Sequence, residues 1–189
     1  MEFRKAELKD IPGIISLEKK YHKNSISEED RPDGYITTFF SDNKLKKLIE
    51  EEKGLAVACD GNKVVGLAGA ASWQFWGKWP VFQPMIDDLP NIKYKNTVLS
   101  VNNCYQYGPA AIDKEYRGTG VLQNLFEASR LLMKDRYPIT VTYVNQTNQR
   151  SFQAHSRKLG FDVVKEFEFH GNKLFVLCYD TSIKTKGSL

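Results

Sequence analysis

Residues 112–122 carry the sequence feature that most limits what this chain can fold into. The stretch reads Ile-Asp-Lys-Glu-Tyr-Arg-Gly-Thr-Gly-Val-Leu, so an apolar strand runs into a loop with two glycines and then into an amphipathic helix. Glycine lacks the Cβ that restricts other residues, so such a loop can turn several N–H groups toward one point. The helix adds unpaired N–H groups and the positive end of its dipole. The pattern therefore predicts an anion site of the kind that binds phosphate.

Two familiar nucleotide signatures fit this loop poorly. The P-loop pattern Gly-x-x-x-x-Gly-Lys-Ser/Thr is absent from the sequence. In a dinucleotide fingerprint a third glycine would stand at Gln123, and the next predicted strand, 139–144, ends in Asn145-Gln146 rather than in an acidic residue. Arg117 still supplies a cation whose fork of donors suits phosphate oxygens. The chain is therefore expected to bind another kind of phosphorylated cofactor.

Composition narrows the class of protein further. A chain of 189 residues, 41% hydrophobic and 26% charged, favours one globular domain. Its net charge of +4 suits an anionic cofactor but is too small for a nucleic-acid binder. The three cysteines are far apart and show no metal-ligand spacing, which predicts free thiols in a reducing compartment and no metal. The longest apolar run, 64–71, is too short for a membrane span, so a cytoplasmic protein without membrane or nucleic-acid partners is expected.

Hydrophobic periodicity predicts an α/β chain. Strands are expected at 3–6, 55–59, 63–71, 104–112, 139–144, 161–169 and 174–179, and helices at 10–21, 45–53, 121–134 and 150–159. The order strand, helix, strand over 104–144 implies a parallel crossover. Residues 24–43 and 73–103 show no regular pattern, which favours loops or short helices.

Two blocks of sequence resemble one known superfamily. Arg-Gly-Thr-Gly-Val at 117–121 resembles the Arg/Gln-x-x-Gly-x-Gly/Ala signature of the GNAT (Gcn5-related N-acetyltransferase) acyltransferases. Residues 148–161 are similar to that family's Asn-x-x-Ala-x-x-x-Tyr-x-x-x-Gly-Phe helix, and the opening, Phe3-Arg4-Lys5-Ala6 with Asp10 and Ile14, is similar to its first strand and helix. Together the blocks cover most of the chain outside the two irregular stretches.

The resemblance implies a fold and a domain plan. It implies a single-domain α/β GNAT fold over 1–180, with a mixed, mostly antiparallel sheet of about seven strands, a central parallel pair and flanking helices. Residues 73–103 are expected to form an insertion on the acceptor side, and 181–189 a flexible tail. The insertion carries aromatic side chains and acids that would suit a cationic amine or, alternatively, complete the core: Trp73, Phe75, Trp76, Trp79, Phe82, Tyr94, Asp87 and Asp88.

The resemblance also implies an activity, the direct transfer of an acetyl group from acetyl-CoA to an amine in a ternary complex. The residues implied for the cofactor are Ala110, Ile112, Arg117, Gly118, Thr119, Gly120, Val121, Leu122, Asn148 and Ser151. Those implied for catalysis are Gln106, Tyr107 and His155, with the imidazole near the leaving thiolate. The partners would be a coenzyme A thioester and an amine substrate. The sequence leaves open which amine is the acceptor and how long the acyl chain is. It also leaves open whether the protein forms a homodimer.

Three positions depart from the family pattern. Leu122 stands where the family usually has Gly or Ala, His155 where it often has a tyrosine, and Gln106 where some members have a catalytic glutamate. The alternatives are a non-catalytic acyl-CoA sensor and a partner-binding module. The single residues also have a purely structural alternative. Gly118 and Gly120 would then only form a tight turn, and His155 and Tyr107 would only pack against their neighbours.

Overall fold

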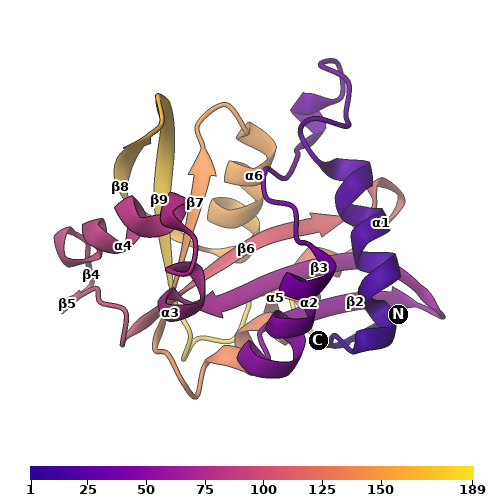
Figure 1. The fold of residues 1–189 in the computed structure, drawn as a ribbon, viewed down its shortest axis with the longest axis horizontal. Coiled ribbons are helices and arrows are strands. Elements are labelled where there is room, and N and C mark those ends of the chain that lie inside the picture. The colour runs from indigo at the N-terminus through magenta and orange to yellow at the C-terminus, as the bar shows by residue number, and fades with distance from the viewer.

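The computed structural model describes residues 1–189 and places seven strands in one sheet (Figure 1). Their spatial order is β1 (Glu2–Lys5), β2 (Leu55–Asp60), β3 (Lys63–Ser72), β6 (Cys104–Ile112), β7 (Ile139–Asn145), β9 (Asn172–Asp180) and β8 (Asp162–Phe169). Neighbouring strands are antiparallel except β6 and β7, which are parallel. The expected fold class, a mostly antiparallel mixed sheet with one central parallel pair, is confirmed.

Helices cover both faces of this sheet. In Figure 1, α1 (Ile11–Tyr21), α2 (Asp42–Lys47), α3 (Trp73–Trp76) and α4 (Gln83–Asp88) lie on the face toward the viewer. The long amphipathic helix α5 (Val121–Met133) lies behind the sheet. Each face has its own hydrophobic core, because side chains on one strand alternate between the two faces. We call these the α1 face and the α5 face.

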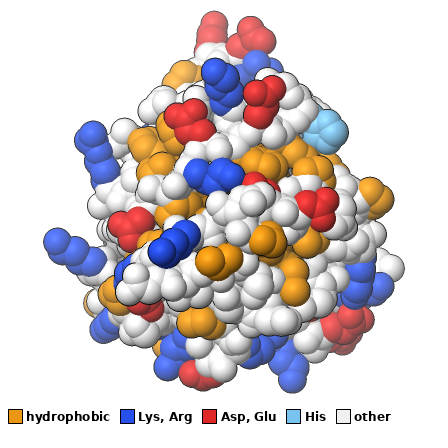
Figure 2. Space-filling view, turned by 90° about the vertical axis from the view of Figure 1, so that its left-hand side faces the viewer, with side chains coloured by type: hydrophobic (Ala, Val, Ile, Leu, Met, Phe, Trp, Pro, Cys, Tyr) orange, Lys and Arg blue, Asp and Glu red, His pale blue; other side chains and the backbone are white.

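The stretch 73–103, expected to be irregular, contains α3, α4 and a small hairpin of β4 (Lys93–Tyr94) and β5 (Thr97–Val98). It is tied to the far edge of the sheet by the Tyr94 hydroxyl, which donates to Asp162 Oδ2 at 2.7 Å, and by an ion pair of 3.0 Å between Lys165 and Asp88. The three aromatic residues of α3 are at most 1% exposed, so this part of the insertion completes the core. Hydrophobic side chains also reach the surface on this side of the molecule (Figure 2).

Two predicted helices each close in a π-helical turn that was not expected. The helix predicted over 45–53 begins at Asp42 and closes in a π-helical turn, Leu48–Glu52. The helix predicted over 150–159 consists of α6 (Gln149–Gln153) and a second π-helical turn, Ala154–Leu159. A period of 3.6 residues cannot predict either turn, since a π turn differs from an α turn by a single residue.

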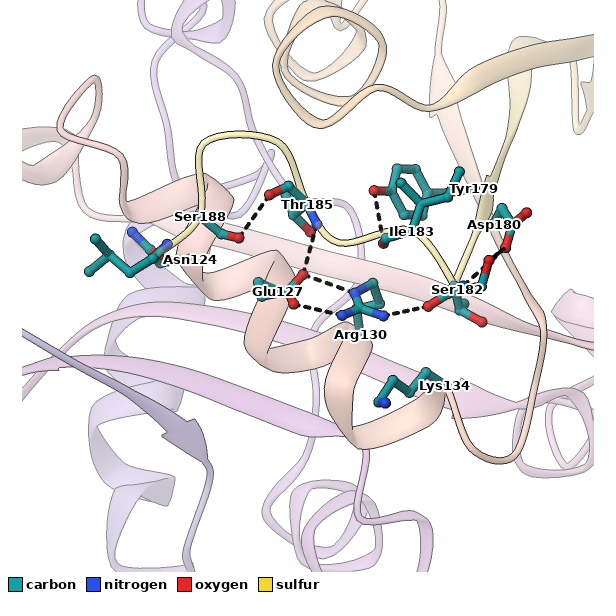
Figure 3. Close-up of polar contacts among 12 residues, drawn as sticks. Asn124, Glu127, Arg130, Lys134, Tyr179, Asp180, Ser182, Ile183, Thr185 and Ser188 are labelled. Carbon is teal, nitrogen blue, oxygen red and sulfur yellow. Dashed lines mark hydrogen bonds and ion pairs between the residues drawn. The ribbon is translucent and has the colours of Figure 1, made fainter.

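Residues 181–189 lie against α5 (Figure 3), where a flexible tail was expected. The anchor is a buried ion pair within α5, in which Arg130 contacts Glu127 at 2.6 Å. Arg130 also donates to the carbonyl of Thr181, and the N–H of Thr185 donates to Glu127 Oε2 at 2.9 Å. Farther along, the N–H of Leu189 donates to Asn124 Oδ1 at 2.8 Å. The segment therefore covers charged groups that would otherwise be exposed on α5.

No helix combines the length and the hydrophobicity needed to cross a bilayer. No group of three or more His, Cys, Asp or Glu side chains is arranged to hold a metal ion.

Candidate functional site

The parallel strands β6 and β7 separate in the middle of the sheet. They pair over only three residues, from Cys104 opposite Ile139 to Gln106 opposite Val141, although both strands continue beyond that point. The break lies at Gly108, whose φ is +125° and whose missing Cβ would meet only Thr142 Oγ1, 4.0 Å away. Past the break, the β7-facing edge of β6 has no strand partner, so its backbone groups are available to a ligand.

A cleft of about 530 Å³ opens along this unpaired edge. Such a volume lies within the usual range for small-molecule sites. Four segments line the cleft: the end of α1 with the loop after it, β6, the glycine loop with the start of α5, and α6 with its π turn. The residues that line the cleft include Tyr21, Asp33, Tyr35, Ala110, Ile112, Arg117, Gly118, Gly120, Leu122, Arg150, Ser151, His155 and Lys158.

The glycine loop presents a cluster of unpaired amides to one end of the cleft. The N–H groups of residues 118–123 donate to no backbone or side-chain acceptor within the protein. Gly118 and Gly120 have φ of +85° and +86°, and a Cβ on Gly118 would meet nothing within 4 Å. The loop thus has the left-handed backbone and open concave surface that an anion-binding nest requires.

Arg117 is partly engaged by the protein itself. Its Nε donates to the carbonyl of Ile112 at 2.9 Å and its Nη1 to the carbonyl of Asp33 at 2.7 Å, while the guanidinium lies over the Tyr21 ring. A guanidinium has five N–H groups, so donors remain for a ligand. Burial lowers the pKa of Arg117, but the group stays charged at neutral pH. Arg117 therefore braces the loop after α1 and also faces the cleft.

Three of the residues implied for the cofactor do not line the cleft. The Thr119 hydroxyl is turned back and donates to the carbonyl of Tyr116 at 2.7 Å. Val121 is 3% exposed and packs in the core. Asn148 caps α6, because its Oδ1 accepts from the N–H of Ser151 at 3.2 Å while its Nδ2 donates to the carbonyl of Tyr35 at 3.0 Å. For Thr119 and Val121 only the main-chain N–H groups are available to a ligand, and Asn148 serves to join α6 to the loop after α1.

His155 faces the cleft from the π turn. The family helix has three residues between this position and the glycine, whereas this chain has four between His155 and Gly160, and the π turn accommodates the additional one. Nδ1 lies 2.8 Å from the carbonyl of Ser151, which fixes the proton on Nδ1 and leaves Nε2 as an acceptor without a protein partner. Burial lowers the pKa of His155, so the neutral imidazole is favoured. A neutral ring suits a proton acceptor better than a proton donor to the leaving thiolate, near which the resemblance places the imidazole.

Gln106 and Tyr107 lie on opposite faces of the sheet. Tyr107 is 1% exposed on the α5 face, where its ring packs edge-on against His155 with centroids 5.7 Å apart. Its hydroxyl has no partner, and burial raises its pKa. Gln106 lies on the α1 face, and its Oε1 is buried without a partner. The three residues implied for catalysis are thus divided, with Tyr107 and His155 together and Gln106 apart.

Several cleft residues were not identified from the sequence. The wall formed by residues 33–36 comes from a stretch without periodicity, and it reaches the cleft through contacts with distant segments. Asp33 contacts Lys114 at 2.6 Å and Arg150 at 3.5 Å. Arg150 and Lys158, from α6 and its π turn, add positive charge to the lining. Of these cleft residues, only Arg150 and Lys158 could have been found from the sequence, because they flank the motif residues Ser151 and His155 on the same helical segment.

Comparison with known proteins defines the fold class. No family model and no curated sequence matches this chain. Among solved structures, smu.2055 from Streptococcus mutans UA159 is 20% identical, with a TM-score of 0.64 over 96% of this chain and 99% of that one. A GNAT family acetyltransferase from Streptococcus agalactiae 2603 is 16% identical, with a TM-score of 0.64 over 95% and 94%.

A third similar structure is the ribosomal-protein-alanine N-acetyltransferase from Brucella melitensis. It is 14% identical, with a TM-score of 0.61 over 95% of this chain and 99% of that one. The chain thus has the GNAT fold, as the two sequence blocks indicated. At these identities the likeness concerns the fold, and the function has to be argued from the cleft.

Proposed function

We propose that this protein is a GNAT-type N-acetyltransferase that moves an acetyl group from acetyl-CoA to an amine by direct transfer in a ternary complex. The observation that carries the proposal is the set of unpaired N–H groups at 118–123, placed at the end of a cleft that follows the free edge of β6. Residues 1–180 would form the acyltransferase domain, with 73–103 on its acceptor side.

The chemistry of the cleft fits coenzyme A in two respects. A diphosphate matches the amides of residues 118–122 and the remaining donors of Arg117, and Arg150 and Lys158 add positive charge nearby. A pantetheine arm contains two amides, and it can pair with the free edge of β6 around Ala110 and Ile112 as an added strand would. Ser151 lines the cleft opposite this edge.

The residues of this chain would position the two substrates and polarise the acyl carbonyl, and none would form a covalent bond to the acyl group. Acetyl-CoA supplies an activated acyl group, and the N–H groups of β6 beyond Gln106 are the donors available to an acyl carbonyl. An amine at neutral pH is mostly ammonium and must lose a proton before it reacts. His155, neutral and with Nε2 free, is the proton acceptor on the cleft side, and Tyr107 supports its ring.

One observation favours the second candidate, a non-catalytic acyl-CoA sensor. Gln106 occupies the place of the carboxylate that some family members use, and it lies on the opposite face from His155. In the sensor the same cleft would bind the cofactor, and no acceptor would be modified.

Calorimetry with acetyl-CoA tests the proposal. We expect saturable binding with one site per chain, and release of free thiol when an amine panel is added. A folded sample that shows no heat of binding would refute both candidates. Binding without thiol release on any amine of the panel would favour the sensor.

A further inference from the structure

Asn124 lies in the first turn of α5, and its side chain holds the last carbonyl of the glycine loop. Its Nδ2 donates to the carbonyl of Gly120 at 3.1 Å, and the backbone N–H of Asn124 donates to the same oxygen at 3.2 Å. A helix normally supplies the backbone bond alone. The carbonyl of Gly120 is therefore directed along α5 by two donors.

The direction of this carbonyl determines where the next N–H group points. The peptide bond between Gly120 and Val121 is trans, and the C=O and N–H groups of a trans peptide point in opposite directions. Because the carbonyl points into α5, the N–H of Val121 points out of the helix end, together with the other unpaired amides of residues 118–123. Asn124 does not line the cleft itself, so it aims the amide cluster without contact with a ligand.

The other end of the Asn124 side chain is held by the segment 181–189, which lies along α5 (Figure 3). Oδ1 accepts from the N–H of Leu189 at 2.8 Å. The two contacts fix the orientation of the side-chain amide, because the reversed amide would place its NH₂ group against the N–H of Leu189. A single side chain therefore connects the segment to the carbonyl of Gly120.

Buried contacts anchor the segment on α5. Thr181 and Thr185 are 1% and 2% exposed. The N–H of Thr185 donates to Glu127 Oε2 at 2.9 Å, and the hydroxyl of Ser188 donates to the carbonyl of Thr185 at 2.8 Å. The second bond closes a turn directly before Leu189, whose side chain is 94% exposed. Leu189 therefore acts through its backbone N–H and not through packing.

We propose that Asn124 is a positioning residue for the amide cluster, and that the segment 181–189 acts on the anion site through it. This inference rests on the proposed function and names a residue that prepares its cofactor site. A site that is arranged before the ligand arrives loses less free energy in ordering. Without Asn124 the peptide after Gly120 has more freedom, since glycine restricts its backbone little. The amides would then bind a diphosphate less tightly in a protein that is still folded.

The competing explanation is that Asn124 is only a surface residue of a helix. Alanine has a higher helix propensity than asparagine, so Asn124→Ala would then leave α5 at least as stable and ligand binding unchanged. Asn124→Ser is the conservative variant, because a serine hydroxyl in a helix can donate to the carbonyl four residues earlier. It keeps a donor for the carbonyl of Gly120.

Calorimetry at matched ionic strength tests the inference with two probes, acetyl-CoA and inorganic pyrophosphate. We expect Asn124→Ala to bind both about 3- to 10-fold more weakly than the wild type, and Asn124→Ser to bind them within about twofold of it. Leu189→Pro removes the N–H donor and should weaken binding by about 2- to 5-fold, whereas Leu189→Ala keeps the donor and should bind like the wild type. The double variant of Asn124→Ala and Leu189→Pro should bind no more weakly than Asn124→Ala alone, because both changes remove the same connection.

Three results would overturn the inference: wild-type affinity in Asn124→Ala, equal losses in Leu189→Ala and Leu189→Pro, or additive losses in the double variant. Melting curves establish that each variant is folded. A wild type that binds pyrophosphate but not acetyl-CoA would refute the proposed function, and the pyrophosphate affinities of the variants would then decide the role of Asn124. A wild type that binds neither probe would overturn both proposals.

Discussion

Replacing Gly120 by alanine tests the amide cluster most directly. Gly120 has φ of +86° and ψ of −3°, and the nearest atom to an added Cβ is Asn124 Nδ2 at 3.9 Å, an ordinary contact. The substitution therefore introduces no clash within the protein. Its cost in stability is the left-handed conformation of alanine, about 1–2 kcal/mol. For a chain of this length that corresponds to a fall in melting temperature of roughly 2–8 °C.

The effect on the cofactor should be larger than this strain. The added methyl group stands on the loop whose N–H groups would approach the diphosphate, and a hydrogen bond to a charged group contributes about 1.5–3 kcal/mol. Loss of one such bond corresponds to roughly a 10- to 100-fold weaker binding of acetyl-CoA. Calorimetry at matched ionic strength measures this change.

Gly171→Ala is the matched control. Gly171 has φ of +72° and nothing within 4 Å of an added Cβ, and it lies in the turn between β8 and β9. It should lose a similar amount of stability and bind acetyl-CoA like the wild type. If Gly120→Ala binds the cofactor as tightly as Gly171→Ala does, the amides of the loop are not the diphosphate site.

The remaining predictions concern charge. Burial lowers the pKa of His155, so below pH 6.5 the unfolded chain binds more protons than the folded one and stability falls as the pH falls. His155→Gln should flatten this pH dependence. Urea denaturation measures the slope of stability against pH, and an unchanged slope would contradict the prediction. Glu127→Gln leaves Arg130 buried without its partner, so the free energy of unfolding should fall by about 3–5 kcal/mol. A loss under about 1 kcal/mol would exclude a structural role for the ion pair. Asp33→Asn removes an anion that contacts Arg150, so calorimetry at low salt should show severalfold tighter binding of acetyl-CoA. Weaker binding would show that the contact between Asp33 and Arg150 instead shapes the cleft.

The glycine loop could be predicted because its signal is local. Gly118 and Gly120 need positive φ, and residues 118–122 need unpaired N–H groups. The first follows from glycine and the second from the start of a helix, whatever surrounds them. The parallel pair of β6 and β7 followed from the order strand, helix, strand for a similar reason. The chain between these elements is too short to allow many other arrangements.

The walls of the cleft could not be predicted, because they depend on contacts between distant residues. Asp33 lies far from Lys114 and Arg150 in the sequence, and its segment has no periodicity that would place it. The engagement of Arg117 by Ile112 and Asp33 is likewise visible only in three dimensions. A motif specifies the type of residue, whereas the donors left free for a ligand depend on all the neighbours.

The sequence by itself determined the sheet, the crossover and the loop of exposed amides, since backbone sterics and hydrophobic alternation act over a few residues. Only the tertiary structure decided that His155 is neutral with Nε2 free and that Gln106 is on the other face. Burial and partners set the protonation of a side chain, and both are sums over residues that meet only in the folded chain.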